Sequence, residues 1–235
     1  VDHIALDLAP GRICGFLGPN GSGKTTTLRM ICGLLIPDAG SGSVLGMDLL
    51  RDRLRIKSQI GYMTQRFGLF EDLTIRDYLR FVADVHGLAN ARDAVDASLD
   101  RLGLASRADQ LAGSLSGGWK QRLALAACVL HNPRILLLDE PTAGVDPQAR
   151  RDFWDQIHAL AADGVTVLVS THYMDEAERC HDIAYIAYGA MLARGTAADI
   201  VAASGLFALT GTGANADRLA HQLQQMSGVD TAAAF

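Results

Sequence analysis

The stretch Gly18-Pro19-Asn20-Gly21-Ser22-Gly23-Lys24-Thr25 decides the fold of this chain. It matches the pattern G-x-x-x-x-G-K-[ST], and it lies between a predicted strand at residues 12–17 and a predicted helix at 24–35. Glycines in this context let backbone N–H groups converge on phosphate oxygens, and the helix N-terminus adds positive potential. Lys24 is expected to reach the β- and γ-phosphates of a nucleotide, and the Thr25 hydroxyl to ligate Mg²⁺. The stretch therefore predicts a phosphate-binding loop on an α/β fold.

A second motif, Arg134-Ile135-Leu136-Leu137-Leu138-Asp139-Glu140, is an apolar run that ends in two acids. Such a run is typical of a parallel strand buried on both faces, and open α/β sheets bind ligands at the carboxyl ends of their strands. Asp139 is predicted to hold Mg²⁺ through its water shell, and Glu140 to polarise an attacking water. Adjacent acids also occur in solvated turns, but the phosphate loop upstream favours the metal site.

A third motif, Leu115-Ser116-Gly117-Gly118, stands directly before an apolar helix predicted at residues 119–130. Alone it would be a generic loop. A serine and two glycines at the start of a helix, however, form a second anion-binding nest. Two phosphate sites in one chain make sense if the second serves a nucleotide bound by another chain.

The remaining chain alternates predicted strands and helices, which favours a mostly parallel sheet with helices on both faces. With the phosphate loop, this predicts a P-loop NTPase core whose sheet also has an antiparallel β edge. Further strands are expected at residues 1–8 (an edge strand), 40–45, 60–63, 165–169 and 183–187, and further helices at 147–162 and 174–180.

Residues 66–130 differ in character and predict an all-helical insertion. Within it, helices are expected at 73–88 and 91–104, with Thr74 and Asn90 as caps. The last segment has a predicted strand at 206–209, a helix at 216–226 and a strand from Val229 onward. We therefore expect a core domain over residues 1–204 and, over 205–235, the start of a small α+β appendage inside which the chain stops.

Composition limits the function classes. The 235 residues are 49% hydrophobic and 20% charged, which is ordinary for one globular domain with a small appendage. The net charge of −5 disfavours a nucleic-acid partner. The longest apolar stretch, 183–193, is too short to span a bilayer, and no leader is seen. The four cysteines are dispersed, which predicts small buried side chains rather than a metal site. The lack of a visible disulfide framework favours a reducing cytoplasm.

Taken together, the motifs resemble the ATP-binding cassette ATPases. The phosphate loop, Gln65, LSGG at 115–118, ILLLDEP at 135–141, AGVD at 143–146 and His172 stand in the family's order and spacing over about residues 1–200. The resemblance implies that two subunits pack head to tail around two ATP molecules. Each ATP would lie between one phosphate loop and the partner's LSGG segment. The implied nucleotide contacts are Gly18, Pro19, Asn20, Gly21, Ser22, Gly23, Lys24, Thr25, Thr26, Ser116, Gly117 and Gly118.

The resemblance also implies roles for single residues. Gln65 would sense the γ-phosphate and touch Mg²⁺, which Thr25 and Asp139 also hold. Glu140, His172 and Gln65 would be catalytic, with His172 contacting the γ-phosphate. By composition alone His172 would be unremarkable, but it follows the strand that ends near residue 170. Asp146 would lie at the dimer seam.

Finer resemblance points to the bacterial multidrug-export branch. The segments GPNGSGKTTTLRMICGLL, IGYMTQRFGLFEDLT and STHYMDEAERC are similar to such ATPases. This implies a membrane permease and a second cassette as partners, at the cytoplasmic face of the membrane. The second cassette could be a copy of this chain or a domain of a longer one. Phe67, Leu69 and Phe70 either dock the permease or belong to the core of the insertion.

Two alternative functions remain open. An import ATPase has nearly the same motifs. A cassette protein acting on ribosomes or chromosomes is disfavoured by the single phosphate loop and the acidic balance.

The chain departs from the family pattern at two points. Trp119 stands where LSGG is normally followed by Gln, and its bulky ring must find room. The aromatic residue that stacks on adenine is expected to lie before residue 1.

Overall fold

The computed structural model describes residues 1–65, 68–207, 209–213 and 215–234. The chain divides into two compact units, one over Val1–Ile200 and one that begins at Val201. The first half of the first unit contains β1 (Ile13–Leu17), α1 (Lys24–Ile31), β2 (Ser43–Val44), β3 (Met47–Asp48), α2 (Arg53–Lys57), β4 (Ile60–Met63), α3 (Ile75–Val85), α4 (Ala91–Arg101), η1 (Ala105–Arg107) and η2 (Ala112–Ser114). There follow α5 (Gly117–Val129), β5 (Ile135–Asp139), α6 (Pro147–Ala162), β6 (Thr166–Thr171), α7 (Met174–Ala177), β7 (Asp182–Ala187), β8 (Ala190–Gly195) and α8 (Ala197–Ser204).

The main sheet of the described residues is six-stranded, in the order β4-β5-β6-β1-β7-β8. The first five strands in this order pair in parallel, and β8 pairs antiparallel with β7 at the edge. The predicted α/β class, with a mostly parallel sheet and an antiparallel edge, is confirmed. Because β4, β5, β6 and β1 are neighbours, their carboxyl ends lie along one edge of the sheet.

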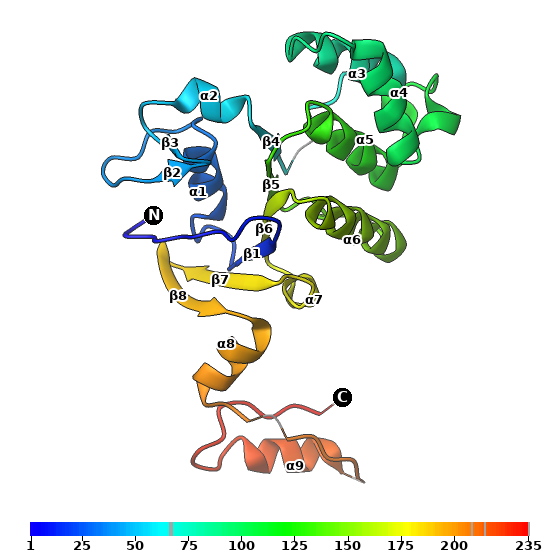
Figure 1. The fold of residues 1–235 in the computed structure, drawn as a ribbon. Helices are drawn as coiled ribbons and strands as arrows, with labels where there is room; N and C mark the ends of the chain where they lie inside the picture. Colours follow the sequence, from blue (N-terminus) through cyan, green and yellow to red (C-terminus); the bar gives the residue numbers. More distant parts are fainter. Residues whose placement is uncertain (66–67, 208, 214, 235) are drawn as a thin grey trace. The chain divides into compact units, whose positions relative to one another are not determined.

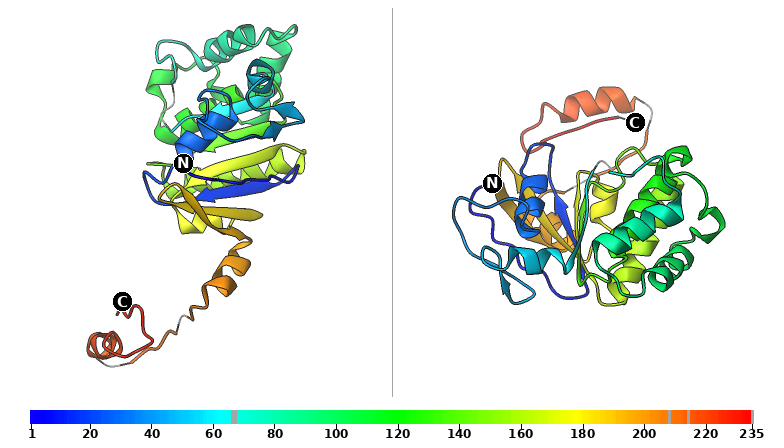
Figure 2. Two further views of the ribbon diagram at one scale, coloured as in Figure 1. Left: turned by 90° about the vertical axis from the view of Figure 1, so that its left-hand side faces the viewer. Right: turned by 90° about the horizontal axis from the view of Figure 1, so that it is seen from above.

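Helices cover both faces of this sheet (Figures 1 and 2): α1 and α2 lie on one side, and α5 and α6 on the other. Successive residues of a strand point to opposite faces. Leu136 and Leu138 of β5 accordingly belong to the core cluster that contains α5 and α6. Leu137 belongs to the cluster that contains Leu28 of α1. This two-sided burial explains why the run before Asp139 has no alternation of apolar and polar residues.

The predicted helical insertion contains α3, α4 and α5. Thr74 is the N-cap of α3, and its Oγ1 accepts a hydrogen bond from the backbone N–H of Asp77 at 3.1 Å. Asn90 stands at the N-cap position of α4 without a side-chain hydrogen bond to the helix. Among the described residues, no helix is both long and apolar enough to cross a bilayer.

Helix α1 and the segment at residues 1–8 are two places where the structure departs from the prediction. α1 ends at Ile31 rather than near residue 35, because Gly33 takes a left-handed conformation (φ 71°) and the Leu34 N–H donates back to the Arg29 carbonyl. The edge strand predicted at residues 1–8 does not form. Its apolar side chains, such as Leu6, pack against the core, and Asp2 N donates to Gly189 O at 2.7 Å. The alternation thus reflects burial without a ladder of strand hydrogen bonds.

The unit that begins at Val201 contains the end of α8 and the helix α9 (Ala216–Leu223). The boundary predicted from the sequence, at residue 204, lies four residues after the end of the first unit at Ile200. Leu206, Phe207 and Leu209 are exposed and lie outside any strand, as does Val229, while Ala208 is not among the described residues. The strands predicted here are therefore absent from the described part of the segment, whose backbone has no neighbouring strand to pair with. Its assignment to an α+β appendage stays a prediction.

A stacked histidine pair predicts a pH dependence of stability. The His86 and His131 rings are nearly parallel, with centroids 4.0 Å apart. Burial, with a smaller contribution from His86, lowers the pKa of His131 to about 4, whereas an unfolded histidine has its ordinary pKa of about 6.5. The unfolded chain therefore binds more protons between these values, and the stability present above pH 6.5 is lost as the pH falls toward 4.

We expect the free energy of unfolding to fall by about 1–2 kcal/mol more in the parent than in His131→Phe between pH 7 and pH 5, after allowance for solvent screening. Phe keeps the stacked ring but does not titrate. Urea unfolding at both pH values measures the difference. Equal pH dependence in the two proteins would exclude this contribution.

Candidate active site

The loop between β1 and α1 needs glycine for steric reasons. A Cβ on Gly18 would lie 2.1 Å from the Ile186 carbonyl oxygen, so no side chain fits there. Gly23 stands at the N-cap of α1 with φ 104°, a conformation that other residues rarely adopt. The loop consequently brings its backbone close to β7 and then turns directly into the helix.

Lys24 lies inside this loop, only 4% exposed. Its Nζ donates to the carbonyl oxygens of Gly18 (2.8 Å) and Pro19 (3.1 Å). It also lies 3.4 Å from Oε1 of Glu140. The ammonium group thus links the phosphate-binding loop to the acid that follows β5.

Asp139, the last residue of β5, is buried and accepts hydrogen bonds from three segments. Oδ1 accepts from Thr25 Oγ1 at 2.9 Å and from Ser170 Oγ at 2.7 Å. Oδ2 lies 3.5 Å from the Tyr62 hydroxyl. Sequence analysis identified neither Ser170 nor Tyr62. The available signal was their position near the carboxyl ends of β6 and β4, the two strands that pair with β5.

Glu140 is the point where the predicted catalytic side chains meet. Its carboxylate accepts a hydrogen bond from Gln65 Nε2 at 3.0 Å and lies 3.4 Å from His172 Nδ1. Its backbone is left-handed (φ 46°), which costs a non-glycine residue about 1–2 kcal/mol. The Glu140 N–H donates to both the carbonyl and the hydroxyl of Ser170, and these bonds hold the strained turn in place.

The oxygen donors at this edge suit Mg²⁺. Thr25 offers a hydroxyl and Asp139 a carboxylate, and Gln65 has a carbonyl oxygen beside the amide nitrogen that donates to Glu140. Within the described ranges there is no group of three or more His, Cys, Asp and Glu arranged to hold a metal. Mg²⁺ typically uses one or two carboxylates together with substrate phosphates and waters, so this sparse donor set fits it.

A cleft of about 350 Å³ opens between the phosphate loop and Glu140. It is lined by Asn20, Gly21, Gly23, Lys24, Thr25, Thr26, Gln65 and Glu140. None of the predicted LSGG contacts lines it. The structure therefore brings the phosphate loop, Gln65, Asp139, Glu140 and His172 together, and it leaves Ser116, Gly117 and Gly118 elsewhere.

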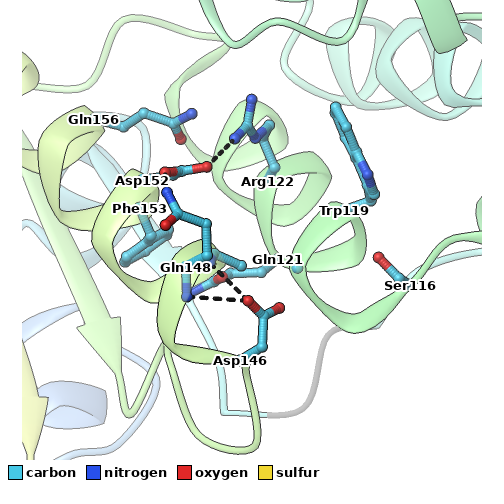
Figure 3. Close-up of a pocket in the computed structure, with 11 residues that line it drawn as sticks. Ser116, Trp119, Gln121, Arg122, Asp146, Gln148, Asp152, Phe153 and Gln156 are labelled. Carbon is cyan, nitrogen blue, oxygen red and sulfur yellow. Dashed lines mark hydrogen bonds and ion pairs between the residues drawn. The ribbon is translucent and has the colours of Figure 1, made fainter.

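The LSGG segment lines a second hollow, of about 190 Å³, between α5 and α6 (Figure 3). Ser116 is the N-cap of α5, and Asp146 caps α6 by accepting from the Gln148 and Ala149 N–H groups at 3.1 and 3.0 Å. A Cβ on Gly118 would come within 2.7 Å of the Ala149 Cβ, so the close approach of the two helices depends on this glycine.

Trp119 is one of the residues that line this hollow. Its ring contacts two guanidinium groups, with the centroid 4.6 Å from Arg107 Cζ and 4.8 Å from Arg122 Cζ (Figure 3 shows Trp119 and Arg122 together on α5). Arg122 in turn pairs with Asp152 of α6 at 3.4 Å. The departure from the family pattern therefore contributes to the packing of α5, and Ser116 stays exposed.

We expect Trp119→Gln to keep ATP hydrolysis within about tenfold of the parent, a barrier change below ~1.4 kcal/mol. The same variant should lose about 1–2 kcal/mol of unfolding free energy, because two cation–π contacts disappear. Steady-state ATPase assays and urea unfolding on one preparation measure both. If the rise of the hydrolysis barrier, in kcal/mol, exceeds the loss of unfolding free energy, Trp119 has a direct role in hydrolysis.

Comparisons with known proteins agree with this geometry. The family model described as "ABC transporter" matches residues 1–143. The probable multidrug ABC transporter ATP-binding protein YbhF of Escherichia coli (strain K12) is 45% identical over 205 residues, 86% of this chain and 36% of that protein. The Nod factor export ATP-binding protein I of Paraburkholderia xenovorans (strain LB400) is 40% identical over 86% of this chain and 67% of its own length. This chain thus spans about a third of the first relative and two thirds of the second.

Solved structures are similar as well. One described as an ATP-binding subunit of an ABC transporter has a TM-score of 0.75 and 30% identity, over 94% of this chain and 91% of its own. Another is the ATP-binding cassette MJ0796, described as a dimer in a post-hydrolysis state with bound ADP and Pi. It has a TM-score of 0.74 and 27% identity, over 81% of this chain and 88% of its own.

Proposed function

Because the chain belongs to the ATP-binding cassette (ABC) transporter family, we propose that it binds and hydrolyses ATP and thereby powers an export system. The observation that carries the proposal is the cleft in which Lys24, Gln65 and Glu140 meet beside Thr25 and Asp139. Such a cleft combines phosphate binding with a carboxylate able to accept a proton.

In the proposed reaction, the phosphate loop and Lys24 hold the triphosphate, and Thr25, Asp139 and Gln65 would hold Mg²⁺. The metal, when bound, neutralises charge on the phosphate oxygens. Glu140 accepts the proton of the attacking water, while Gln65 keeps the carboxylate oriented through its amide. His172 has a buried Nδ1 without a hydrogen bond in the described residues, and we assign it to the γ-phosphate.

The working unit is a head-to-tail pair. This is supported by the separation of the phosphate cleft and the LSGG hollow within one chain, since each alone would contact only part of a nucleotide. It is also supported by the resemblance to MJ0796, described as dimeric. In the pair, Ser116, Gly117 and Gly118 of one subunit face the ATP of the other. The second cassette is either another copy or a domain of a longer chain.

We assign the export direction from the relatives, whose names specify multidrug, Nod factor and daunorubicin resistance systems. The partner is a membrane permease, which holds the chain at the cytoplasmic face of the membrane. Phe70 and Phe81 are 49% and 45% exposed, and their rings meet edge-to-face at 5.2 Å on the insertion. They are our candidate docking surface. Leu69 is half-buried and packs against the core, and Phe67 lies outside the described residues.

Sedimentation analysis with and without ATP and Mg²⁺ tests the sandwich. The slow-hydrolysing Glu140→Gln variant should be monomeric alone and shift to dimer with ATP, because a ligand shared by both subunits stabilises their association. Adding Ser116→Arg should keep it monomeric, since the bulk obstructs the LSGG hollow. A stable dimer without nucleotide, or ATP-driven dimers of the Arg variant, would contradict the sandwich.

A further inference from the structure

Glu176 is a buried carboxylate that does not line the nucleotide cleft. It lies on α7 and is 1% exposed. One oxygen accepts a hydrogen bond from Thr171 Oγ1 at 2.6 Å, and the other accepts from Thr142 Oγ1. A carboxylate removed from water needs such partners. A third partner, Arg150, has its Nε 3.7 Å from Glu176 Oε1.

The two threonines belong to the segments that carry the catalytic side chains. Thr142 stands two residues after Glu140, in the turn that follows β5. Thr171 is the last residue of β6 and directly precedes His172. Both hydroxyl groups are buried, and one carboxylate bonds them both. Glu176 therefore joins the two loops from which Glu140 and His172 project, beyond the end of the sheet pairing that holds β5 and β6.

A second set of contacts also leads to His172. The Thr171 hydroxyl, which donates to Glu176, accepts from the Tyr173 N–H at 3.0 Å and so closes the turn around His172. The Arg150 guanidinium lies over the Tyr173 ring, 4.4 Å from its centroid. That ring contacts the His172 imidazole, with centroids 4.2 Å apart. The backbone and the ring of His172 are thus both held through neighbours of Glu176.

We propose that Glu176 is a positioning residue for ATP hydrolysis: it keeps His172 Nδ1 beside Glu140 Oε2, where the two lie 3.4 Å apart. The inference rests on the proposed ATPase function. Glu176 acts through His172, and its side-chain partners among the described residues, Thr142, Thr171 and Arg150, lie outside the phosphate loop. Loss of the Glu176 carboxylate therefore lowers the rate of hydrolysis in the ATP-bound protein and leaves ATP affinity unchanged.

The test is a double-mutant cycle between Glu176→Gln and His172→Ala, measured as kcat and KM for ATP. Gln keeps the shape but replaces one acceptor oxygen by an NH₂ group, so one threonine hydroxyl loses the acceptor of its hydrogen bond. We expect kcat to fall about tenfold, within the range for an ångström-scale displacement, and KM to change less than about twofold. In the His172→Ala background, Glu176→Gln should lower kcat less than about twofold, because the effects of coupled residues are non-additive.

A matched pair at Thr171 keeps the test valid if Glu176→Gln does not fold. Thr171→Ser retains the hydroxyl, and its kcat should stay within about twofold of the parent value. Thr171→Val removes the hydroxyl, and its kcat should fall about as much as that of Glu176→Gln. Ile157→Val, a buried α6 substitution that only weakens packing, controls for stability and should keep the parent kcat.

Three outcomes overturn the proposal. Independent, multiplicative losses for Glu176→Gln and His172→Ala would mean that Glu176 does not act through His172. A rise in KM for ATP as large as the fall in kcat would indicate a binding or folding defect. Absence of hydrolysis in the parent protein would overturn the proposed ATPase together with this inference, whereas the first two outcomes leave the ATPase intact.

Discussion

Glu140→Gln should slow single-turnover hydrolysis of ATP by ~10²–10⁴-fold, which corresponds to ~3–5.5 kcal/mol of barrier. The carboxylate lies within reach of Lys24, Gln65 and His172 at the sheet edge, where it can accept the proton of an attacking water. An amide of the same shape can hold the water but cannot take its proton.

ATP binding should survive in this variant. Lys24 keeps its hydrogen bonds to the Gly18 and Pro19 carbonyls, and removal of the nearby carboxylate leaves its charge more available to phosphate. We therefore expect unchanged or tighter ATP affinity by calorimetry. Glu178→Gln, at an exposed site, is the control and should hydrolyse ATP at the parent rate. Near-parent hydrolysis in Glu140→Gln would show that Glu140 is not the base, and a collapse of affinity would assign it to metal binding or structure.

Lys24→Ala should weaken ATP binding by about 10–100-fold, because hydrogen bonds to a charged group contribute about 1.5–3 kcal/mol each. Lys24 is the buried cation of the cleft lining, and no other lysine or arginine is among the described residues that line it. Its removal also leaves the Glu140 carboxylate without its ion-pair partner beside the phosphates, which adds repulsion.

Titration calorimetry with ATP and Mg²⁺ measures this loss. Lys57→Ala, which removes an exposed lysine at the end of α2, is the matched control and should bind like the parent. Thermal unfolding checks that the loop variant is folded, because Lys24 also bonds two carbonyls of its own loop. Parent-like affinity in a folded Lys24→Ala protein would overturn the phosphate-loop assignment.

Local patterns in the sequence predicted much of the fold. Helix α6 has the predicted bounds, Pro147–Ala162, because Asp146 and Pro147 form a start signal within a few residues. Strand β4 also has its predicted bounds, Ile60–Met63. The edge strand predicted at residues 1–8 was wrong, and the described residues of the segment 206–209 form no strand either. A strand needs a pairing partner, and alternation of side chains cannot specify one.

For the site, the sequence by itself determined which residues stand at the ends of the strands: the phosphate loop, Gln65, Asp139, Glu140 and His172. Spacing and glycine content are sufficient for this, since both act over a few residues. Only the tertiary structure decided that Ser170 orients Asp139, that Trp119 contacts two guanidinium groups, and that Glu176 bonds two threonines. These contacts join segments far apart in the chain, and a buried polar group takes whichever partner the packing brings within hydrogen-bond distance.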